Sequence, residues 1–435
     1  MASGTSESPI DKPASQPKKI RLDSIDALRG LAALSVALYH AWGHDGTYPW
    51  YSIGIVTQTP HAHWLSYLTF PFRWGYLGVS FFLVLSGFCI HLPAARNLVA
   101  AGSYQFKAKA FYLRRLWRLY PAYFVAVVAT TILLWCMHLA GARKLPGNAD
   151  VPSAWDVFTH LTLLHGYFAS TFYSIASVFW SLALEFQLYL AYPFFLYLFR
   201  KFGTFHAVVI LTGVAIVWRL ALLNYFGAGL ISISDHGTIV GMGSVLGRMP
   251  EWLFGALLAE LYFRREELWD RLIAKRYILL SLGIALFALA ILSTMYERGW
   301  SLTDPLFGTA FAFFVAATIL PKKAEQRHRH SWAYRWLIGV GVFSYSLYLF
   351  HLQLSWLISP IVDKIPGLLL PFLARILWLM VSIRIIRGIF VIVEKPFLRA
   401  PREGERFYGI FQKIQHSLGI EPTTVATEPA KGFAA

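Results

Sequence analysis

The chain alternates between long apolar stretches and short polar intervals. A bilayer core of about 30 Å requires roughly 20 mostly apolar residues per helix. We identify ten such stretches, at residues 25–43, 75–92, 119–140, 174–199, 205–223, 239–263, 277–296, 303–320, 337–359 and 366–394. Prolines that favour helix boundaries, such as Pro93 and Pro321, lie in the intervals. The pattern predicts an all-α polytopic membrane helix bundle of about ten transmembrane helices.

Composition supports this prediction, because only 14% of the residues are charged and 57% are hydrophobic. A soluble globular domain carries about 25% charged residues. The formal net charge of +16 does not indicate nucleic-acid binding, since the basic residues form short clusters between apolar spans rather than one soluble basic face. Only two cysteines are present, which excludes a disulfide-rich secreted scaffold.

The distribution of positive charge predicts the orientation. Of the 39 Lys and Arg residues, 28 lie in alternate segments that include both tails, and five lie in the opposite loops. Short basic loops remain in the cytoplasm, so we expect both termini to be cytoplasmic, in a protein of the plasma or inner membrane.

Three regions follow from these spans. Residues 1–22, rich in Ser, Pro and Lys, are expected to form a disordered cytoplasmic tail. Residues 23–399 form the predicted transmembrane domain. Residues 400–435 form a cytoplasmic tail, in which 406–418 is predicted to be a short amphipathic helix on the inner leaflet.

The first span carries ionisable residues, which are costly inside a membrane and are candidates for function. Arg29 and His40 are eleven residues apart. They share one helix face to within about 20° and lie about 16 Å apart along the axis. Asp26 lies about one turn before Arg29 and can pair with it. Alternatively, Arg29 extends to the lipid phosphates and His40 is a structural polar residue.

A second basic cluster, Arg114, Arg115 and Arg118, lies in the predicted cytoplasmic loop that enters the third span. Clustered guanidinium groups suit bidentate binding of phosphate esters. The same arginines are equally well explained by the basic character of any cytoplasmic loop.

Other buried ionisable residues fall in the middle or outer half of the bilayer. His351 is predicted to lie at almost the same depth as His40, and Glu185 also lies in this region. Arg248 and Glu251 are expected to form a structural ion pair. An alternative class of function for such residues is a transporter that uses an intramembrane His, Arg and Glu proton relay.

Seven segments, in order, resemble the acyltransferase-3 family of membrane O-acyltransferases. They are IDALRGLAALSVALYH (25–40), YLGVSFFLVLSGFCI (76–90), YLRRLWRLYPAY (112–123), VFWSLALEFQLYLAYP (178–193), GRMPEWLFGALLA (247–259), SYSLYLFHLQL (344–354) and VEKPF (393–397). Two positions depart from the family pattern, since Ala27 replaces the usual Gly and Phe186 replaces the second Glu of a pair. The chain also lacks the C-terminal hydrolase-like domain that some O-antigen acetylases carry.

The resemblance implies a ten-helix enzyme that takes an acyl group from cytoplasmic acyl-CoA, foremost acetyl-CoA, to a hydroxyl of a carbohydrate. The expected acceptor is a cell-surface polysaccharide or a lipid-linked sugar, with a small natural product as the alternative. Acyl-CoA is a co-substrate, and no bound cofactor or metal is expected. The family's motifs map onto His40, Arg29, Arg115 and Arg118, onto Trp180, Ser181 and Glu185, and onto Ser344, Tyr345 and His351.

The expected mechanism joins the residue positions to this resemblance. His40 acts as general base on the acceptor hydroxyl, and a carboxylate, Glu185 or Asp26, orients its ring. The alternative is a covalent mechanism, in which His40 or a hydroxyl briefly carries the acyl group. The remaining candidates divide into a set that binds the CoA phosphates and a set that contacts the substrate: Arg29, Arg114, Arg115 and Arg118 for the first, and Trp180, Ser181, Tyr345 and His351 for the second.

Overall fold

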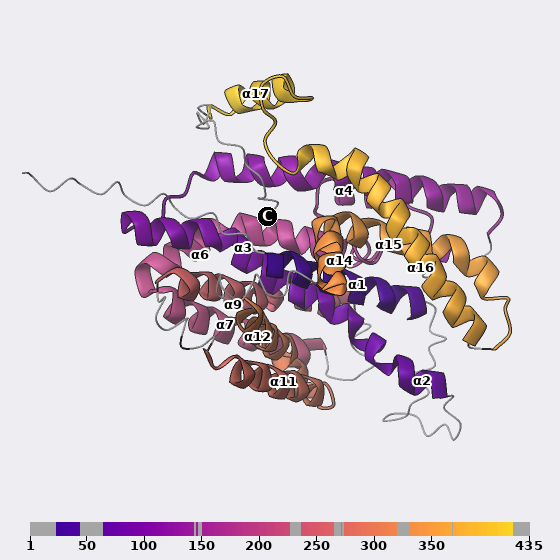
Figure 1. The fold of residues 1–435 in the computed structure, drawn as a ribbon, viewed down its shortest axis with the longest axis horizontal. Coiled ribbons are helices and arrows are strands. Elements are labelled where there is room, and N and C mark those ends of the chain that lie inside the picture. Colours follow the sequence, from indigo (N-terminus) through magenta and orange to yellow (C-terminus); the bar gives the residue numbers. More distant parts are fainter. Residues whose placement is uncertain are drawn as a thin grey trace, which may run out of the picture.

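The computed structural model describes residues 23–43, 64–142, 145–146, 150–226, 236–264, 271, 274–319, 331–367 and 369–420. Within these ranges the chain is built of helices and contains no strand (Figure 1). The predicted tail at 1–22 lies outside the described residues, as does the end of the second predicted tail, 421–435.

The longer elements follow one another along the whole described chain. They are α1 (Asp23–Gly43), α2 (Trp64–Thr69), α3 (Gly78–Ala101), α4 (Ala108–Leu139), α5 (Ala154–Leu161), α6 (Trp180–Phe202), α7 (Thr204–Phe226), α8 (His236–Met242), α9 (Val245–Arg264), α11 (Arg276–Ser293), α12 (Trp300–Thr318), α14 (Trp332–Val342), α15 (Ser344–Val362), α16 (Leu369–Ile389) and α17 (Tyr408–Ser417). Short 3-10 turns precede α3 and α6, and a π-helical turn, η7 (Phe390–Glu394), extends α16.

Many of these helices are long and apolar enough to cross a membrane, which confirms the predicted polytopic helical membrane fold. Among the described residues there are seven, or up to eight if the bent pair α14 and α15 counts as one span. Helices α1 and α9 coincide with the first and sixth predicted spans, but their charged residues make them less apolar than the others. The total of ten spans and the cytoplasmic location of both termini stay predictions.

The structure corrects several predicted boundaries. The predicted loop at 93–118 is largely helical, because α3 continues to Ala101 and α4 begins at Ala108. The ninth predicted span, 337–359, is not one helix: α14 and α15 meet at Phe343 with a bend of 82°. The sixth is divided into α8 and α9, and the fourth begins six residues later than predicted, at Trp180.

Glycines allow two pairs of helices to approach closely. A Cβ on Gly341 of α14 would lie 1.8 Å from the carbonyl oxygen of Asp26 in α1, and one on Gly87 of α3 would lie 1.8 Å from that of Trp252 in α9. Small residues at such crossings bring backbones into van der Waals contact, which drives helix association in lipid. The first crossing fixes the part of α1 that carries Arg29.

The central helices bring distant parts of the sequence together. Helix α1 packs against α3, α14, α15 and α16, and α3 packs against α9 and α12. Figure 1 shows α1 and α3 in the middle of the bundle, with α4 along one side and α7, α9, α11 and α12 along the other. Helix α1 therefore lies between α3 and α15, and the family motifs on these three helices meet there.

The short helix α17 lies in the segment predicted to be an amphipathic helix. It packs against the start of α4, where the rings of Trp117 and Phe411 have centroids 4.8 Å apart. Lys109 Nζ donates a hydrogen bond to the carbonyl oxygen of Leu418 at 3.0 Å. Its location on the inner leaflet stays a prediction.

Candidate active site

A cavity lies between α1, α3, α4, α6 and α15, and the polar part of its lining comes from the family motifs. Because these helices come from five separate parts of the chain, the cavity exists only in the folded bundle. Its polar lining consists of Arg29, Ser86, Arg115, Arg118, Ser181, Glu185, Tyr189, Ser344, Tyr345 and Tyr348.

Three arginines gather at one end of the cavity. Arg115 and Arg118 lie one turn apart on α4, and Arg29 faces them from α1. Within the described chain, Arg115 and Arg118 form no hydrogen bond or ion pair with a protein carboxylate, and the Arg115 guanidinium lies over the rings of Phe111 and Tyr189. The nearest pairing of Arg29 is with Asp26, at 4.0 Å between Nη1 and Oδ1.

The cavity lining itself carries three guanidinium groups and one carboxylate, Glu185, and this net positive charge favours an anionic ligand. Asp26 and Glu394 act on Arg29 and Arg118 from outside the lining, whereas Arg115 and Arg118 form no ion pair with a described carboxylate and suit bidentate binding of an anion. The bend between α14 and α15 adds to the positive potential of the cavity, because it places the N-terminus of α15 there: the first residues of α15, Ser344 and Tyr345, line the cavity. A helix N-terminus carries partial positive charge, as in discontinuous transmembrane helices that bind anions.

The bent helix α15 is held in place by a buried carboxylate. Glu394, in the π-helical turn η7, accepts hydrogen bonds from the backbone N–H and the hydroxyl of Ser346, the N–H at 3.0 Å. A carboxylate at the first turn of a helix satisfies N–H groups that have no intrahelical partner. Glu394 thereby fixes the end of α15 that faces the cavity.

His40 and His351 form a hydrogen-bonded pair. His351 Nε2 lies 3.0 Å from His40 Nδ1, and His351 Nδ1 lies 3.0 and 2.9 Å from the carbonyl oxygens of Leu347 and Tyr348. Because a carbonyl only accepts, the proton of neutral His351 is on Nδ1 and its Nε2 is an acceptor. His40 therefore donates from Nδ1, which also lies 3.0 Å from the carbonyl oxygen of Val36. Its lone pair is on Nε2.

The pair lies next to the cavity rather than in its lining. Tyr348, which lines the cavity, has its ring centroid 5.9 Å from that of His351. The Tyr348 hydroxyl lies 2.6 Å from Ser181 Oγ and donates to the carbonyl oxygen of Val178 at 3.0 Å. The arginines thus lie at one end of the cavity, and the histidine pair lies behind Tyr348 at the other.

The carboxylates expected to orient His40 lie elsewhere. Glu185 accepts hydrogen bonds from Ser86 Oγ, at 3.1 Å, and from the hydroxyl of Tyr189. Asp26 is fourteen residues before His40 on the same helix, about 21 Å along its axis. The bend before α15 brings His351 to Nδ1 of His40, and the orienting role of a carboxylate stays a prediction.

The remaining predicted residues divide by location. Ser181, Glu185 and Tyr345 line the cavity, whereas the Arg114 side chain is exposed and does not line it. Trp180, at the start of α6, does not line it but lies under the guanidinium of Arg248, 5.6 Å from the ring centroid. His351 is buried against His40, so its contact is with that ring and not with the cavity.

Sequence reasoning missed Tyr348, Phe82 and Glu394. The three-residue spacing of Tyr345, Tyr348 and His351 places all three on one helix face and is a signal for Tyr348. Phe82 and Glu394 lie within motifs of the family but carry no spacing signal, because their partners come from other helices.

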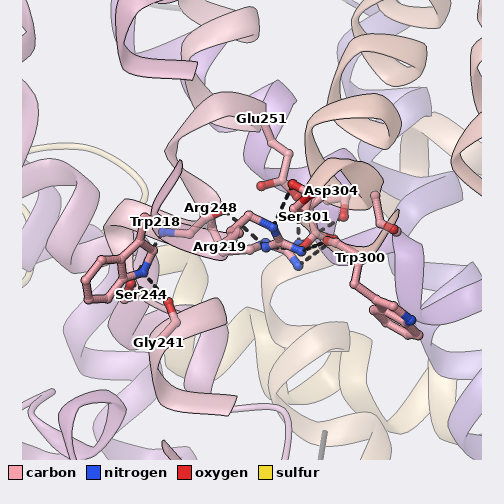
Figure 2. Close-up of polar contacts among 12 residues, drawn as sticks. Trp218, Arg219, Gly241, Ser244, Arg248, Glu251, Trp300, Ser301 and Asp304 are labelled. Atoms are coloured by element: carbon pink, nitrogen blue, oxygen red, sulfur yellow. Dashed lines mark hydrogen bonds and ion pairs between the residues drawn. The ribbon is translucent and has the colours of Figure 1, made fainter. Parts of the chain in front are cut away.

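The expected ion pair of Arg248 and Glu251 is present as part of a larger buried cluster (Figure 2). Arg248 Nη2 lies 2.7 Å from Glu251, and its Nη1 lies 3.0 Å from Asp304. Asp304 also pairs with Arg219 at 2.7 Å, and Arg219 donates to the carbonyl oxygens of Trp300 and Ser301. The cluster joins α7, α9 and α12, and two cations balance two anions, so its role is structural.

Two stacked histidines support the start of α6 from the connection after α4. The rings of His160 and His165 are nearly parallel, with centroids 3.9 Å apart, and His165 Nε2 donates to the carbonyl oxygen of Phe179 at 3.0 Å. Burial lowers the pKa of His160 to about 3 and that of His165 to about 4. Both rings are therefore neutral at physiological pH.

These features define a polytopic helical membrane protein with an arginine-lined internal cavity and a buried histidine pair. The chain belongs to the acyltransferase-3 family, because the family model described as "Acyltransferase domain" matches residues 22–390. The family suggested by the motifs is confirmed.

Three relatives are similar to the chain at 25–30% identity. The chain is 30% identical over 186 residues to "Peptidoglycan O-acetyltransferase OatA" of Listeria monocytogenes, covering 41% of this chain and 24% of the relative. It is 26% identical over 373 residues to "Putative O-acetyltransferase SACOL0978" of Staphylococcus aureus, covering 80% and 53%. It is 25% identical over 363 residues to "Putative peptidoglycan O-acetyltransferase YrhL" of Bacillus subtilis, covering 79% and 50%. The chain thus spans about half of these relatives or less. No solved structure matches it.

Proposed function

We propose that the protein transfers an acyl group from cytoplasmic acyl-CoA to a hydroxyl of a carbohydrate, at a site inside the membrane. The observation that carries this proposal is a cavity that is lined by three arginines and that ends at Tyr348, next to the His40–His351 pair. Acyl transfer from acyl-CoA needs a binding site for the anionic donor, which the arginines supply, and a general base, which the histidine pair supplies. Family membership supports the same class of reaction.

The arginine end binds the donor. Arg29, Arg115 and Arg118 hold the phosphates of CoA, because planar guanidinium groups bind phosphate oxygens in a bidentate manner. The pantetheine arm then extends along the cavity towards Tyr348. Arg114 is not included in this site, since its side chain is exposed and does not line the cavity.

His40 is the general base of the transfer. Its Nε2 accepts the proton of the acceptor hydroxyl while the hydroxyl oxygen attacks the thioester carbonyl. The C–O bond forms, the C–S bond breaks, and the His40 imidazolium returns the proton to the departing CoA sulfur. His351 accepts the Nδ1 hydrogen bond throughout, which fixes the tautomer of His40 and stabilises its imidazolium form.

His351 is therefore a positioning residue, in place of the expected carboxylate. Glu185 lines the cavity between the arginines and Tyr348, and its hydrogen bonds to Ser86 and Tyr189 fix the position of its side chain. Ser181 holds the Tyr348 hydroxyl at the far end.

The acceptor is a cell-surface polysaccharide or a lipid-linked sugar that approaches His40 from the side away from the arginines. The names of the relatives support a carbohydrate acceptor, since those proteins are called O-acetyltransferases and two of the names include peptidoglycan. The donor enters from the cytoplasm, because the predicted topology places the arginines at that surface.

The test uses purified protein in liposomes supplied with isotope-labelled acetyl-CoA and a total glycan extract from cells that lack the gene. We expect an alkali-labile acetyl ester on a glycan, detected by mass spectrometry, and its loss in His40→Ala. His138→Ala is the matched control, because His138 is exposed at the end of α4, and it should retain full activity. Equal turnover by His40→Ala and the unmodified protein would contradict the mechanism, and label only on small metabolites would contradict the carbohydrate acceptor.

A further inference from the structure

Two aromatic rings that line the cavity meet towards the end opposite the arginines. The Phe82 ring of α3 meets the Tyr348 ring of α15 edge to face, with centroids 5.9 Å apart at 80°. The hydroxyl of Tyr348 is held by Ser181 and by the carbonyl oxygen of Val178. Tyr348 is buried, whereas Phe82 is only partly buried and lines the cavity.

The position of these rings can be measured along α3. Residues from Val79 to Ile90 line the cavity, a distance of about 16 Å along the helix axis. The arginines lie towards the Ile90 end. Phe82 is about 12 Å from Ile90 on this axis and one turn from the last lining residue of α3. A donor bound by its phosphates at the arginines therefore presents its thioester end to Phe82 and Tyr348.

We propose that Phe82 and Tyr348 limit the donor to short acyl groups, acetyl foremost. This inference rests on the proposed function. In an acyl-CoA the acyl chain lies beyond the thioester, so each additional methylene extends towards the two rings. Tyr348 cannot give way without breaking two buried hydrogen bonds. A longer chain thus has to displace Phe82, and inserting methylenes into packed aromatic surroundings is unfavourable.

The histidine pair lies next to this end of the cavity, since the Tyr348 and His351 ring centroids are 5.9 Å apart and His351 contacts His40. The thioester carbonyl has to come close to His40 for the transfer. A chain that folded back along the cavity would move the carbonyl away from His40. Phe82 therefore selects for chain length through the position of the reacting carbon, and not through donor affinity alone.

Phe81, the neighbouring residue, provides a matched control. Its ring stacks on Phe311 of α12, with centroids 4.7 Å apart and an interplanar angle of 14°, and it does not line the cavity. Replacing Phe81 or Phe82 by alanine removes the same atoms from the same helix. Only the second change removes a side chain that lines the cavity.

The experiment measures kcat/KM for acetyl-CoA, butyryl-CoA and hexanoyl-CoA with purified protein in liposomes and the glycan extract as acceptor. We expect the unmodified protein to prefer acetyl-CoA. Phe82→Ala should raise the butyryl-to-acetyl ratio by about tenfold or more, since a methylene in an apolar pocket changes specificity by about this factor. Phe82→Leu should raise it less, and Phe81→Ala should leave it unchanged.

Each outcome has one meaning. A ratio that is the same in Phe82→Ala and Phe82→Leu as in the unmodified protein, with measurable acetyl transfer, overturns this inference and leaves the proposed function intact. A preference of the unmodified protein for hexanoyl-CoA does the same. Absence of transfer from every CoA thioester overturns the proposed function and the inference together. If Phe82→Ala does not fold, as judged by size-exclusion chromatography, Phe82→Leu decides the question.

Discussion

His351 offers the most direct test of the proposed mechanism. Replacing it by phenylalanine keeps a ring of similar size in a buried position but removes the Nε2 acceptor that lies 3.0 Å from His40 Nδ1. It also removes the Nδ1 donor to the carbonyl oxygens of Leu347 and Tyr348. Those carbonyls retain their helical hydrogen bonds, so the main loss is at His40.

The size of the effect follows from that one contact. In the transition state His40 becomes an imidazolium, and its Nδ1–H donates a charge-assisted hydrogen bond to His351. Such a bond contributes about 1.5–3 kcal/mol. Because the charge on His40 develops only in the transition state, loss of this hydrogen bond should lower kcat by about 10- to 150-fold. It should leave the KM for acyl-CoA nearly unchanged.

The assay is steady-state transfer of labelled acetyl groups by purified variants in liposomes, with thermal unfolding in detergent as a check of stability. His351→Gln is the control, because the glutamine carbonyl oxygen can replace Nε2 as acceptor and should recover activity to within about tenfold of the unmodified protein. A purely structural role would affect unfolding temperature rather than kcat and would not be rescued by glutamine. Unchanged kcat in a stable His351→Phe variant would refute the reasoning.

Three further predictions concern the donor site, the buried ion cluster and the outer connection. Arg118→Gln should raise the KM for acyl-CoA by about tenfold or more with little change in kcat, whereas Arg114→Gln should change this KM less than about threefold. Equal effects of the two substitutions on KM would contradict the assignment of Arg118, and not Arg114, to the donor site. Asp304→Asn should lower stability by about 3–5 kcal/mol, because two buried arginines lose a counter-charge, and an unchanged unfolding temperature would refute this. The folded pKa values of His160 and His165, about 3 and about 4, lie below the unfolded value near 6.5. Stability should therefore fall as the pH decreases from about 6.5, by up to about 1.4 kcal/mol per histidine and pH unit, and a double His→Asn variant should show a flatter pH dependence of thermal unfolding.

Much of the architecture could be predicted from the local sequence, because the hydropathy of a membrane span is a property of consecutive residues. The lipid-exposed surfaces of helices such as α4, α11 and α16 require long apolar stretches, and these were identified at the right places. The bend between α14 and α15 could not be found in this way. It occurs inside a continuous apolar stretch, and its polar backbone groups are satisfied by Glu394 from a later segment.

The candidate site was predictable in part for a related reason. The eleven-residue spacing of Arg29 and His40 and the three-residue spacing of Arg115 and Arg118 are properties of single helices. Depth in the membrane also follows from the sequence, which is why His351 was placed level with His40. The identity of the residue that contacts His40 depends on which helix packs against α1, so the contact with His351 could not be predicted from the sequence.

The sequence by itself determined that this is a helical membrane protein of the acyltransferase-3 family, because apolar periodicity, charge distribution and ordered motifs are all local properties of the chain. Tertiary structure decided which side chains share a cavity and which do not. The close crossing at Gly341 and the bend before α15 bring His351 to His40, and Phe82 to Tyr348, from segments more than 250 residues apart. Contacts between such segments depend on helix packing, which no local pattern specifies.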